Sequence, residues 1–593
     1  MLDYKKLIQA YDVISFDVFD TLLLRPFLLP SDLFVMIERR EKRVGFARDR
    51  IAAEREAYAR MVKEGRKECT LDEIYSFMPQ WCDLESVEYQ AEEESLVANP
   101  ETLELYKYSL ALGKQVIITS DMYLPGDFVR RQLQRNGFDG WTGFFLSSEQ
   151  NAQKRTGELF AKILQKFSKD DAHRKVLHIG DNWDSDVIMA QQNGIRGVYY
   201  PKVVDRFHEI NPFVRKFSDG DRRKRLIAGA FALGWHLFQC EHPDCDYWSR
   251  LGFLQAGFLG GMYVNWIADQ CRKENIDHLM FVARDGYIWQ KMAAILCPEI
   301  RSDYFYSSRM TALLVSEDRM SENWSTRNRR EQILKLLVDE CGVPKDVVDV
   351  EVYLDKGILP EEVRCKLKEM TKNELCAYRA YLSGFDFDAG HSAVVDGCSL
   401  NGSGQKLVEE AMGSRVRTYY LLRLGDIENG KGVFNSPPNR TRFIDLCEFM
   451  FGAPTPPIKK IIDGHPVYKN EMHEYEKLKV AVNLQITQAA EAAALIIKKH
   501  RLNILPEDWL DWCDAFMDNL TSEDRVMLSQ ACNSGDVEHK SYKSVIWPNR
   551  ARSWHQTRFK VPFLLRYYRK GLCWYHDYLL AGKIRVRRRV YKI

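Results

Sequence analysis

The sequence predicts an α/β protein with two domains, each built on a parallel β-sheet. Short apolar runs that look like strands alternate with stretches of helical periodicity in residues 1–205 and again in residues 246–460. Several of these runs end on acidic, hydroxyl-bearing or glycine residues, as expected where the carboxyl ends of parallel strands form a ligand-binding edge. A chain of 593 residues with 45% hydrophobic residues is long enough for several cores.

Five strands are expected in the first domain, and a helical insert is expected after the first of them. The strand candidates are Val13–Phe16, Gln115–Thr119, Gly143–Leu146, Val176–Ile179 and Gly197–Tyr200. The charged insert covers about residues 27–100. The polar stretch Phe217–Arg225 predicts a linker, which we place at residues 206–245.

Four distant segments of the first domain carry residues suited to phosphoryl chemistry. Asp17 follows the first strand, Ser120 ends the second, Lys154 follows the third, and Asp181 and Asp186 follow the fourth. Parallel strands would bring these positions to one edge. An aspartate can attack phosphorus, a group of carboxylates suits Mg²⁺, and a hydroxyl and a lysine would hold phosphoryl oxygens.

These segments resemble the four motifs of the haloacid-dehalogenase superfamily of hydrolases and phosphotransferases. The matching pieces are FDVFDTLL, IITS, the lysine of NAQKRTGELF and GDNWDSD, in that order, over about residues 10–205. The resemblance implies a Rossmann-like sheet, a nucleophile at Asp17 and a helical cap formed by the insert. It also implies catalytic roles for Ser120 and Lys154 and a Mg²⁺ site made by Asp17, the carbonyl of Phe19, Asp181 and Asp186.

Phe19 departs from the pattern of the phosphatases in this superfamily. They usually carry a second aspartate at this position as general acid and base, whereas the dehalogenase branch has an aromatic residue there. Asp20 is a candidate for the role, although on an extended strand it would point to the opposite face. A cap residue and substrate-assisted proton transfer stay open, as does a fold that binds metal without turnover.

The second domain ends its own strands on charged residues and glycines. Strands are expected at Leu279–Val282, Tyr304–Tyr306, Ala393–Val395 and Thr418–Leu422. Asp396 is expected to end the third of these, and Gly402 and Gly404 to open a helix that begins near Gln405. Backbone N–H groups at such a turn can bind a phosphate, and Asp396 is placed to bind sugar hydroxyls.

This arrangement resembles the type I phosphoribosyltransferase fold, in which two acids and a glycine-rich loop bind a phosphoribosyl group. Position 397 is glycine, so the second acid of that pattern is absent here. Binding of another phosphate ligand and a purely structural turn stay open. The substrate-binding residues implied by the resemblance are Arg284, Asp285, Arg309, Asp396, Asn401, Gly402, Ser403 and Gly404.

The combination of both domains, over about residues 10–470, resembles bacterial polysaccharide-assembly proteins that transfer ribofuranose. The resemblance implies a two-activity enzyme of surface polysaccharide (O antigen or capsule) synthesis. One domain would transfer 5-phosphoribosyl from phosphoribosyl pyrophosphate to a lipid-linked glycan acceptor, and the other would remove the 5-phosphate with Mg²⁺. The alternatives are a sugar or nucleotide phosphatase whose second domain only binds substrate, and a non-catalytic scaffold.

The C-terminal part is expected to be helical over residues 461–548 and basic and aromatic over residues 549–593. The last stretch holds thirteen lysines and arginines and a single acid, Asp577. Such a composition suits an anionic membrane surface, with nucleic-acid binding or a helix packed on the body as alternatives. Unpaired cysteines, no signal peptide and no long apolar run indicate a cytoplasmic protein, peripheral at the inner face of the plasma membrane.

Overall fold

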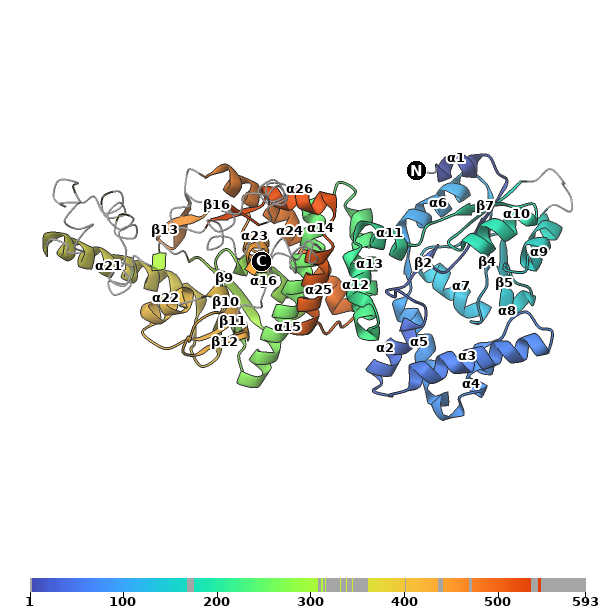
Figure 1. Ribbon diagram of the computed structural model, residues 1–593, viewed down its shortest axis with the longest axis horizontal. Helices are drawn as coiled ribbons and strands as arrows, with labels where there is room; N and C mark the ends of the chain where they lie inside the picture. Colours follow the sequence, from blue (N-terminus) through green and yellow to red (C-terminus); the bar gives the residue numbers. More distant parts are fainter. Residues whose placement is uncertain are drawn as a thin grey trace, which may run out of the picture. The chain divides into compact units, whose positions relative to one another are not determined.

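The computed structural model describes residues 3–167, 175–307, 361–399, 402–435, 441–468, 472–534 and 542–545, together with six positions between 311 and 344. The chain divides into two compact units, Met1–Asp244 and Cys245–Ile593, which are described here one at a time (Figure 1). Each unit contains a five-stranded parallel sheet, so the expected α/β class with two parallel sheets is confirmed.

The sheet of the first unit has the order β5-β4-β1-β6-β7, and every neighbouring pair is parallel. The strands are β1 Val13–Phe16, β4 Gln115–Ser120, β5 Gly143–Leu146, β6 Val176–Gly180 and β7 Arg196–Tyr199. All five were expected within one or two residues. The direction in which strands are added reverses between β1 and β6, and this is where ligands bind in open parallel sheets.

Helices flank this sheet and position the loops at its carboxyl edge. They are α1 Tyr4–Gln9, α6 Pro100–Ala111, α7 Gly126–Arg135, α8 Ser147–Gln150, α9 Glu158–Phe167, the π-helix η2 Trp183–Met189 and α10 Ala190–Gln192. In α9, Leu159, Phe160 and Ile163 are buried and pack against Val13 and Ile117 of the sheet. This apolar face orients the segment that carries Lys154.

The expected insert is helical. It contains α2 Asp32–Arg40, α3 Phe46–Lys63, α4 Leu71–Ser76, the 3₁₀ helix η1 Pro79–Leu84 and α5 Glu85–Ser95. It is framed by two short antiparallel strands, β2 Leu23–Leu24 and β3 Val97–Ala98. The buried Arg50 of α3 donates two hydrogen bonds, of 2.9 and 2.8 Å, to the carboxylate of Glu88 in α5. This charge-assisted pair fixes the two helices to each other.

Residues 206–245, which the sequence predicts to be a linker, instead form helices of the first unit. These helices are α11 Val203–Ile210, α12 Phe213–Ser218 and α13 Arg222–Glu241. The polar stretch marks the start of α13, because the Asp221 side chain accepts hydrogen bonds from the backbone N–H groups of Arg223 and Lys224. Gly229 of α13 lets the backbone at Pro26 approach, since an added Cβ would lie 2.5 Å from the Pro26 carbonyl oxygen.

The sheet of the second unit has the order β12-β11-β10-β8-β9 and is also fully parallel. Its strands are β8 His278–Val282, β9 Arg301–Phe305, β10 Ser392–Ser399, β11 Arg417–Arg423 and β12 Gly430–Phe434. The order reverses between β8 and β10. The sequence does not predict β12, because its two glycines interrupt any apolar run. Asp396 lies inside β10 and does not end it, and α22 begins at Ser403, before Gln405.

The remaining elements of the second unit are mainly helices. They are α14 Tyr247–Leu251, η3 Gly252–Ala256, α15 Gly257–Glu274, α16 Gly286–Leu296, α21 Glu361–Leu382, η5 Ser383–Phe385, α22 Ser403–Met412, α23 Thr441–Met450, α24 Glu474–Lys499, α25 Pro506–Asp518 and α26 Ser522–Gln530. Two hairpins, β13 Ile458–Ile462 with β14 His465–Tyr468 and β15 Cys532–Ser534 with β16 Tyr542–Ser544, complete the described part.

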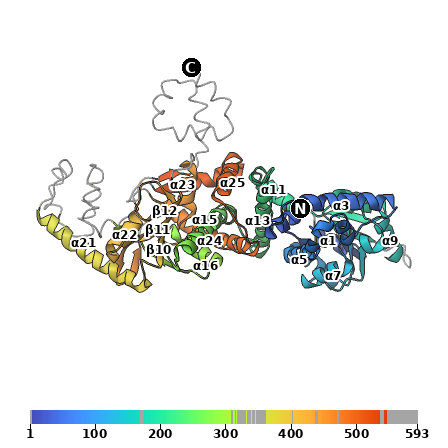
Figure 2. The same cartoon turned by 90° about the horizontal axis from the view of Figure 1, so that it is seen from below.

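Helix α24 packs closely on η3, α15 and α16 (Figure 2). Gly252 of η3 makes this approach possible, because an added Cβ would lie 2.5 Å from the carbonyl oxygen of Ile486. Among the described residues, α24 alone is long and apolar enough to cross a membrane, yet half of that stretch is buried in the unit. The expected helical region 461–548 therefore contributes to the same unit as the second sheet. The expected basic tail, residues 549–593, lies outside the described residues.

Candidate active site

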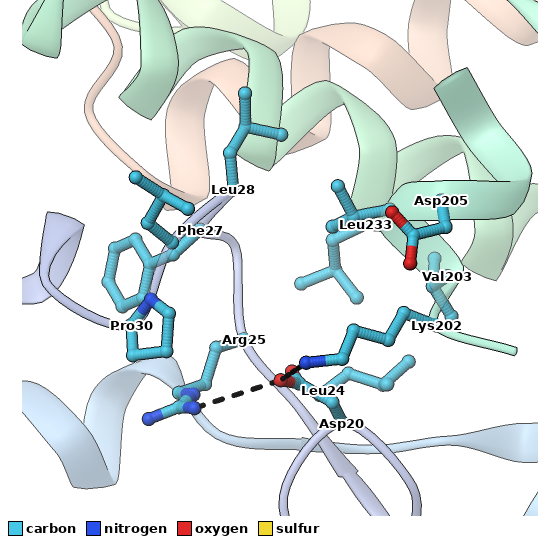
Figure 3. A pocket seen from close by; sticks show the side chains of 12 residues that line it. Asp20, Leu24, Arg25, Phe27, Leu28, Pro30, Lys202, Val203, Asp205 and Leu233 are labelled. Atoms are coloured by element: carbon cyan, nitrogen blue, oxygen red, sulfur yellow. Dashed lines mark ion pairs between the residues drawn. The ribbon is translucent and has the colours of Figure 1, made fainter. Parts of the chain in front are cut away.

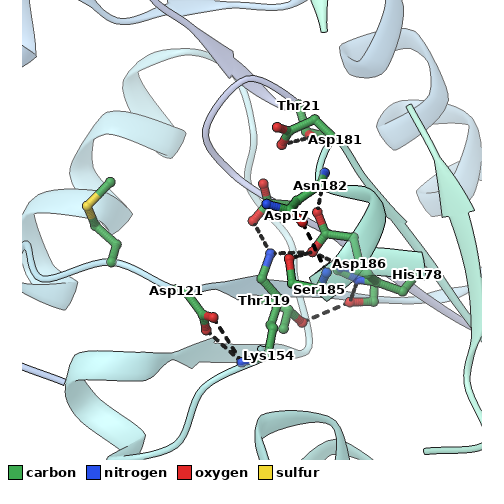
Figure 4. A network of polar contacts seen from close by, with 12 residues as sticks. Asp17, Thr21, Thr119, Asp121, Lys154, His178, Asp181, Asn182, Ser185 and Asp186 are labelled. Atoms are coloured by element: carbon green, nitrogen blue, oxygen red, sulfur yellow. Dashed lines mark hydrogen bonds and ion pairs between the residues drawn. The ribbon is translucent and has the colours of Figure 1, made fainter. Parts of the chain in front are cut away.

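Three carboxylates meet at the strand reversal of the first sheet. Asp17 directly follows β1, Asp181 directly follows β6, and Asp186 comes from η2 (Figure 4). One carboxylate oxygen of each lies within 4.8 Å of those of the other two, and all three residues are buried. Carboxylates separated by about 170 positions in the chain thus converge as the sequence predicted.

Lys154 joins two of these carboxylates. Its Nζ atom donates to Oδ1 of Asp17 at 2.6 Å and to Oδ1 of Asp186 at 2.7 Å. Its backbone N–H donates to both carboxylate oxygens of Asp121, at 2.8 and 3.0 Å, so the lysine is held at both ends. Burial opposes the charge of Lys154, but Asp17 and Asp186 outweigh burial and raise its pKa.

The three carboxyl groups are not equivalent. Burial raises the pKa of Asp17 well above its ordinary value, and the charges of Asp186 and Asp181 add to this although Lys154 opposes it. Burial also raises the pKa of Asp181. Burial acts in the same direction on Asp186, but Lys154 and His178 lower its pKa overall. These three carboxylates lie close together, and their oxygen donors fit a hard divalent cation.

A buried chain of hydrogen bonds supports Asp186 from inside the sheet. Nε2 of His178 lies 3.2 Å from Oδ1 of Asp186, and Nδ1 of His178 lies 2.7 Å from the hydroxyl of Ser15. The Ser15 hydroxyl in turn lies 2.8 Å from the hydroxyl of Thr119. Ser15, Thr119 and His178 are not among the residues that the sequence motifs predicted. They could have been found in the sequence as polar side chains within strands that are otherwise continuously apolar.

The other predicted residues of the first site lie at the same edge with different surroundings. Ser120 is buried at the end of β4, next to β1 in the sheet. The Phe19 ring packs against the guanidinium of Arg25, with 5.0 Å between the ring centroid and Cζ. Asp20 has a left-handed φ of 58°, and its carboxylate lies 3.6 Å from Nζ of Lys202.

Lys202 connects Asp20 to the carboxylate cluster, because the same Nζ atom lies 3.1 Å from Oδ2 of Asp181. Asp20 and Lys202 also line a cavity of about 280 Å³ (Figure 3). Arg25, which pairs with Asp20 at 4.0 Å, and Asp205 also line it, together with apolar residues such as Phe27, Leu28 and Leu233. A concave site that combines apolar contacts with a few charged groups is typical of small-molecule binding. The cavity therefore offers a place for the group that carries a reacting phosphate.

A second set of metal-ligating side chains in this unit does not fit a cation. Glu101, His236 and Cys240 bring ligand atoms within 4.8 Å of one another. The Glu101 carboxylate, however, pairs with Arg206 at 2.9 Å and accepts from the Tyr200 hydroxyl at 2.6 Å. Since arginine already supplies the positive charge, this set is a structural polar cluster.

In the second unit, two carboxylates lie at the reversal between β8 and β10, each against a glycine. Oδ1 of Asp396 accepts from the backbone N–H of Gly397 at 2.8 Å. An added Cβ at Gly397 would lie 2.5 Å from Oδ2 of Asp285, and one at Gly404 would lie 3.1 Å from Oδ2 of Asp396. Burial raises the pKa of Asp396 to about 6. Asp285 thus occupies the space beside position 397, where the sequence lacks an acid.

The turns that flank these acids contain residues with left-handed backbone. Arg284, after β8, has a left-handed φ of 72°, its N–H donates to the Tyr304 hydroxyl at 3.0 Å, and its guanidinium pairs with Glu476. Gly402 caps α22 with a φ of 63°. Ser403 and Gly404 form the first turn of α22, as a phosphate-binding helix start requires. The predicted residues Arg309 and Asn401 lie outside the described residues.

No protein-family model matches the chain, and no curated protein matches it in sequence. The assignment of function therefore depends on the geometry of the two sheet edges and on the chemistry of their residues.

Proposed function

We propose that the first unit is a Mg²⁺-dependent phosphatase of the haloacid-dehalogenase type that acts through an aspartyl phosphate. The observation that carries the proposal is Asp17, buried at the strand reversal, 2.6 Å from the ammonium of Lys154 and close to Asp181. Asp17, Asp181, Asp186 and the carbonyl of Phe19 would hold the ion. When bound, the ion supplies positive charge to the carboxylates and to a phosphoryl oxygen.

Asp17 is the nucleophile in this proposal. Its carboxylate oxygen forms a bond to phosphorus while the bond from phosphorus to the ester oxygen breaks. Lys154 and Ser120 hold the phosphoryl oxygens as charge moves onto them. Asp20, in the wall of the cavity, gives its proton to the departing oxygen. A water molecule then attacks phosphorus, passes a proton to Asp20, and releases phosphate and free Asp17.

We further propose that the second unit transfers 5-phosphoribosyl from phosphoribosyl pyrophosphate to a glycan acceptor. The 5-phosphate would lie at the N-terminus of α22, and Asp396 and Asp285 would bind the ribose hydroxyls. The first unit would then remove the 5-phosphate and leave ribofuranose on a bacterial surface polysaccharide precursor. One chain carrying both activities raises the effective concentration of the second step. A cytoplasmic location at the membrane, with a lipid-linked acceptor, is part of this proposal.

The first experiment separates the two activities with Asp17→Asn. The purified protein is incubated with phosphoribosyl pyrophosphate, Mg²⁺ and candidate glycans, and release of pyrophosphate and of phosphate is followed. Asp17→Asn should keep acceptor-dependent pyrophosphate release but accumulate the phosphorylated product, because Asp17 belongs only to the first site. Loss of both steps in this variant would contradict the assignment of phosphate removal to the first unit and of transfer to the second.

The complementary variant is Asp396→Ala. It should stop pyrophosphate release while Mg²⁺-dependent hydrolysis of a simple phosphomonoester continues. Unchanged pyrophosphate release would remove Asp396 from the transfer site. Absence of pyrophosphate release from the unmodified protein, with phosphatase activity present, would favour a phosphatase whose second unit only binds substrate. Absence of both activities would favour a scaffold.

A further inference from the structure

Lys479 of α24 is a buried lysine whose ammonium makes no ion pair with another described residue, although the charges of Glu476, Asp285 and Glu448 act on it. The residue is 9% exposed, and its Nζ atom donates to the backbone carbonyl of Glu448. In the part of the chain that the structure describes, no carboxylate lies within ion-pair distance of this ammonium. Burial and the nearby charge of Arg284 lower its pKa to about 8, although the carboxylates of Glu476, Asp285 and Glu448 act in the opposite direction. An unpaired buried charge is costly, so a stable fold retains one where an anion binds.

Asn483 lies one helical turn further on the same face of α24. It is fully buried, and neither Oδ1 nor Nδ2 has a hydrogen-bond partner among the described residues. Both side chains lie against Gly452, where an added Cβ would come within 2.9 Å of Cε of Lys479 and would overlap Nδ2 of Asn483. Buried amide groups are almost always hydrogen-bonded, so this pair of unmet groups indicates a polar partner.

This face of α24 belongs to the strand reversal of the second sheet. Lys479 is close enough to Arg284 and Asp285, both directly after β8, for their charges to act on it. Nε of Arg284 is also buried without a partner among the described residues, although its terminal nitrogen pairs with Glu476. The side chains of Lys479, Asn483 and Arg284, which can all donate further hydrogen bonds, therefore lie on the side of the sheet edge where Asp285 lies. The start of α22, with Gly404, lies instead against Asp396.

We propose that Lys479 and Asn483 form an anion subsite that binds the diphosphate group of the phosphoribosyl donor. This assignment rests on the proposed transfer activity of the second unit. Nζ of Lys479 and Nδ2 of Asn483 donate to diphosphate oxygens, and Nε of Arg284 contributes a third donor. The subsite neutralises the charge that develops on the diphosphate as it departs from the sugar. The start of α22 is left for the single 5-phosphate.

The test measures binding of inorganic pyrophosphate with Mg²⁺ to the full chain by calorimetry. Lys479→Met should weaken binding by about tenfold or more, because a hydrogen bond to a charged group contributes about 1.5–3 kcal/mol. Asn483→Leu should weaken it severalfold. The matched control is Lys477→Met, which removes an exposed lysine from the same helix and should leave binding unchanged.

Thermal unfolding without ligand separates this role from a structural one. Lys479→Met should melt at the same temperature as the unmodified protein or higher, since it removes a charge that burial disfavours and that no ion pair within the described residues holds. A lower melting temperature with unchanged pyrophosphate affinity would overturn the proposal. So would an unmodified protein that does not bind pyrophosphate at millimolar concentration, or one that binds inorganic phosphate equally tightly at this subsite.

The proposed transfer activity can fail separately. If the unmodified protein binds pyrophosphate and Lys479→Met does not, the subsite is established as an anion site. If no acceptor-dependent pyrophosphate release is then found in the same preparation, the transfer activity is wrong, and the pyrophosphate subsite stands without it.

Discussion

At the scale of single residues, Ser15 and His178 occupy positions where a central strand usually holds apolar side chains. Their hydrogen bonds run from Thr119 through Ser15 and His178 to Asp186. Burial lowers the pKa of His178, although Asp186 opposes this. A neutral imidazole that lies between a hydroxyl and a carboxylate fixes the orientation of Asp186, and Asp186 in turn holds Lys154 beside Asp17.

Leu28 tests whether the cavity of Figure 3 accepts the leaving group. Leu28→Trp should reduce kcat/KM for a pentose 5-phosphate by about tenfold, since about 1–3 kcal/mol is the usual cost of a misfit in such a cavity. Hydrolysis of acetyl phosphate, which is too small to need the cavity, should not change. Leu112→Trp, at an exposed position of the same unit, is the control. An equal loss on both substrates would mean that the cavity does not bind the leaving group.

At the scale of elements, two contacts depend on a glycine, because a side chain at that position would block the neighbouring backbone or carboxylate. Gly229 of α13 admits the backbone at Pro26, and Gly397 of β10 admits the carboxylate of Asp285. The second contact shapes this sheet edge, because it places the carboxylate of Asp285 beside a strand position that has no acid of its own. Local sequence patterns around position 397 do not show this contact.

Gly397→Ala should therefore damage both folding and the second site. Its Cβ would lie 2.5 Å from Oδ2 of Asp285, so the carboxylate must move. We expect the free energy of unfolding, measured with urea, to fall by about 1–3 kcal/mol. Gly384→Ala, where an added Cβ would meet nothing within 4 Å, should change it by much less. Similar losses in both variants would refute the contact.

At the scale of the whole molecule, each unit has its own sheet, its own strand reversal and its own group of buried polar residues. The first unit extends to Asp244 because α11, α12 and α13 complete it. The predicted boundary at residue 205 would remove three helices and part of the cavity wall, including Leu233.

A fragment of residues 1–244 should fold and keep Mg²⁺-dependent phosphatase activity. A fragment of residues 1–205 should be insoluble or inactive, since it exposes the surface that α13 covers at Gly229. Circular dichroism and hydrolysis of acetyl phosphate in each fragment check this prediction. Equal activity in the two fragments would show that the three helices are dispensable for the site.

Buried histidines should make the protein sensitive to mild acid. Burial lowers the pKa of His208, His236 and His500 to about 4. The unfolded chain therefore binds more protons than the folded protein between about pH 6.5 and about pH 4. The contribution of these neutral histidines to the free energy of unfolding should be complete above about pH 6.5 and should decrease as the pH falls towards about 4.

The measurement is the urea midpoint as a function of pH for the unmodified protein and for His236→Gln. The variant removes one of these histidines and should show a shallower decrease. For the groups around His236, the carboxylate of Glu101 acts to raise its pKa and the guanidinium of Arg206 to lower it. A parallel decrease in both proteins would show that His236 does not contribute.

The sequence by itself determined where nine of the strands lie. It also determined that Asp17, Ser120 and Asp181 lie at the ends of such strands or directly after them. These features are local, because a buried parallel strand is a short apolar run and its end is marked by the next polar residue. The topology rule then places such ends together.

Only the tertiary structure decided which distant groups complete each site. Lys202, which follows β7, contacts Asp20 and Asp181. Asp285 lies beside Gly397. Lys479 lies near Asp285 although its helix comes nearly two hundred residues after β8. No periodicity encodes these contacts, since each depends on how close two backbones come after the elements have packed.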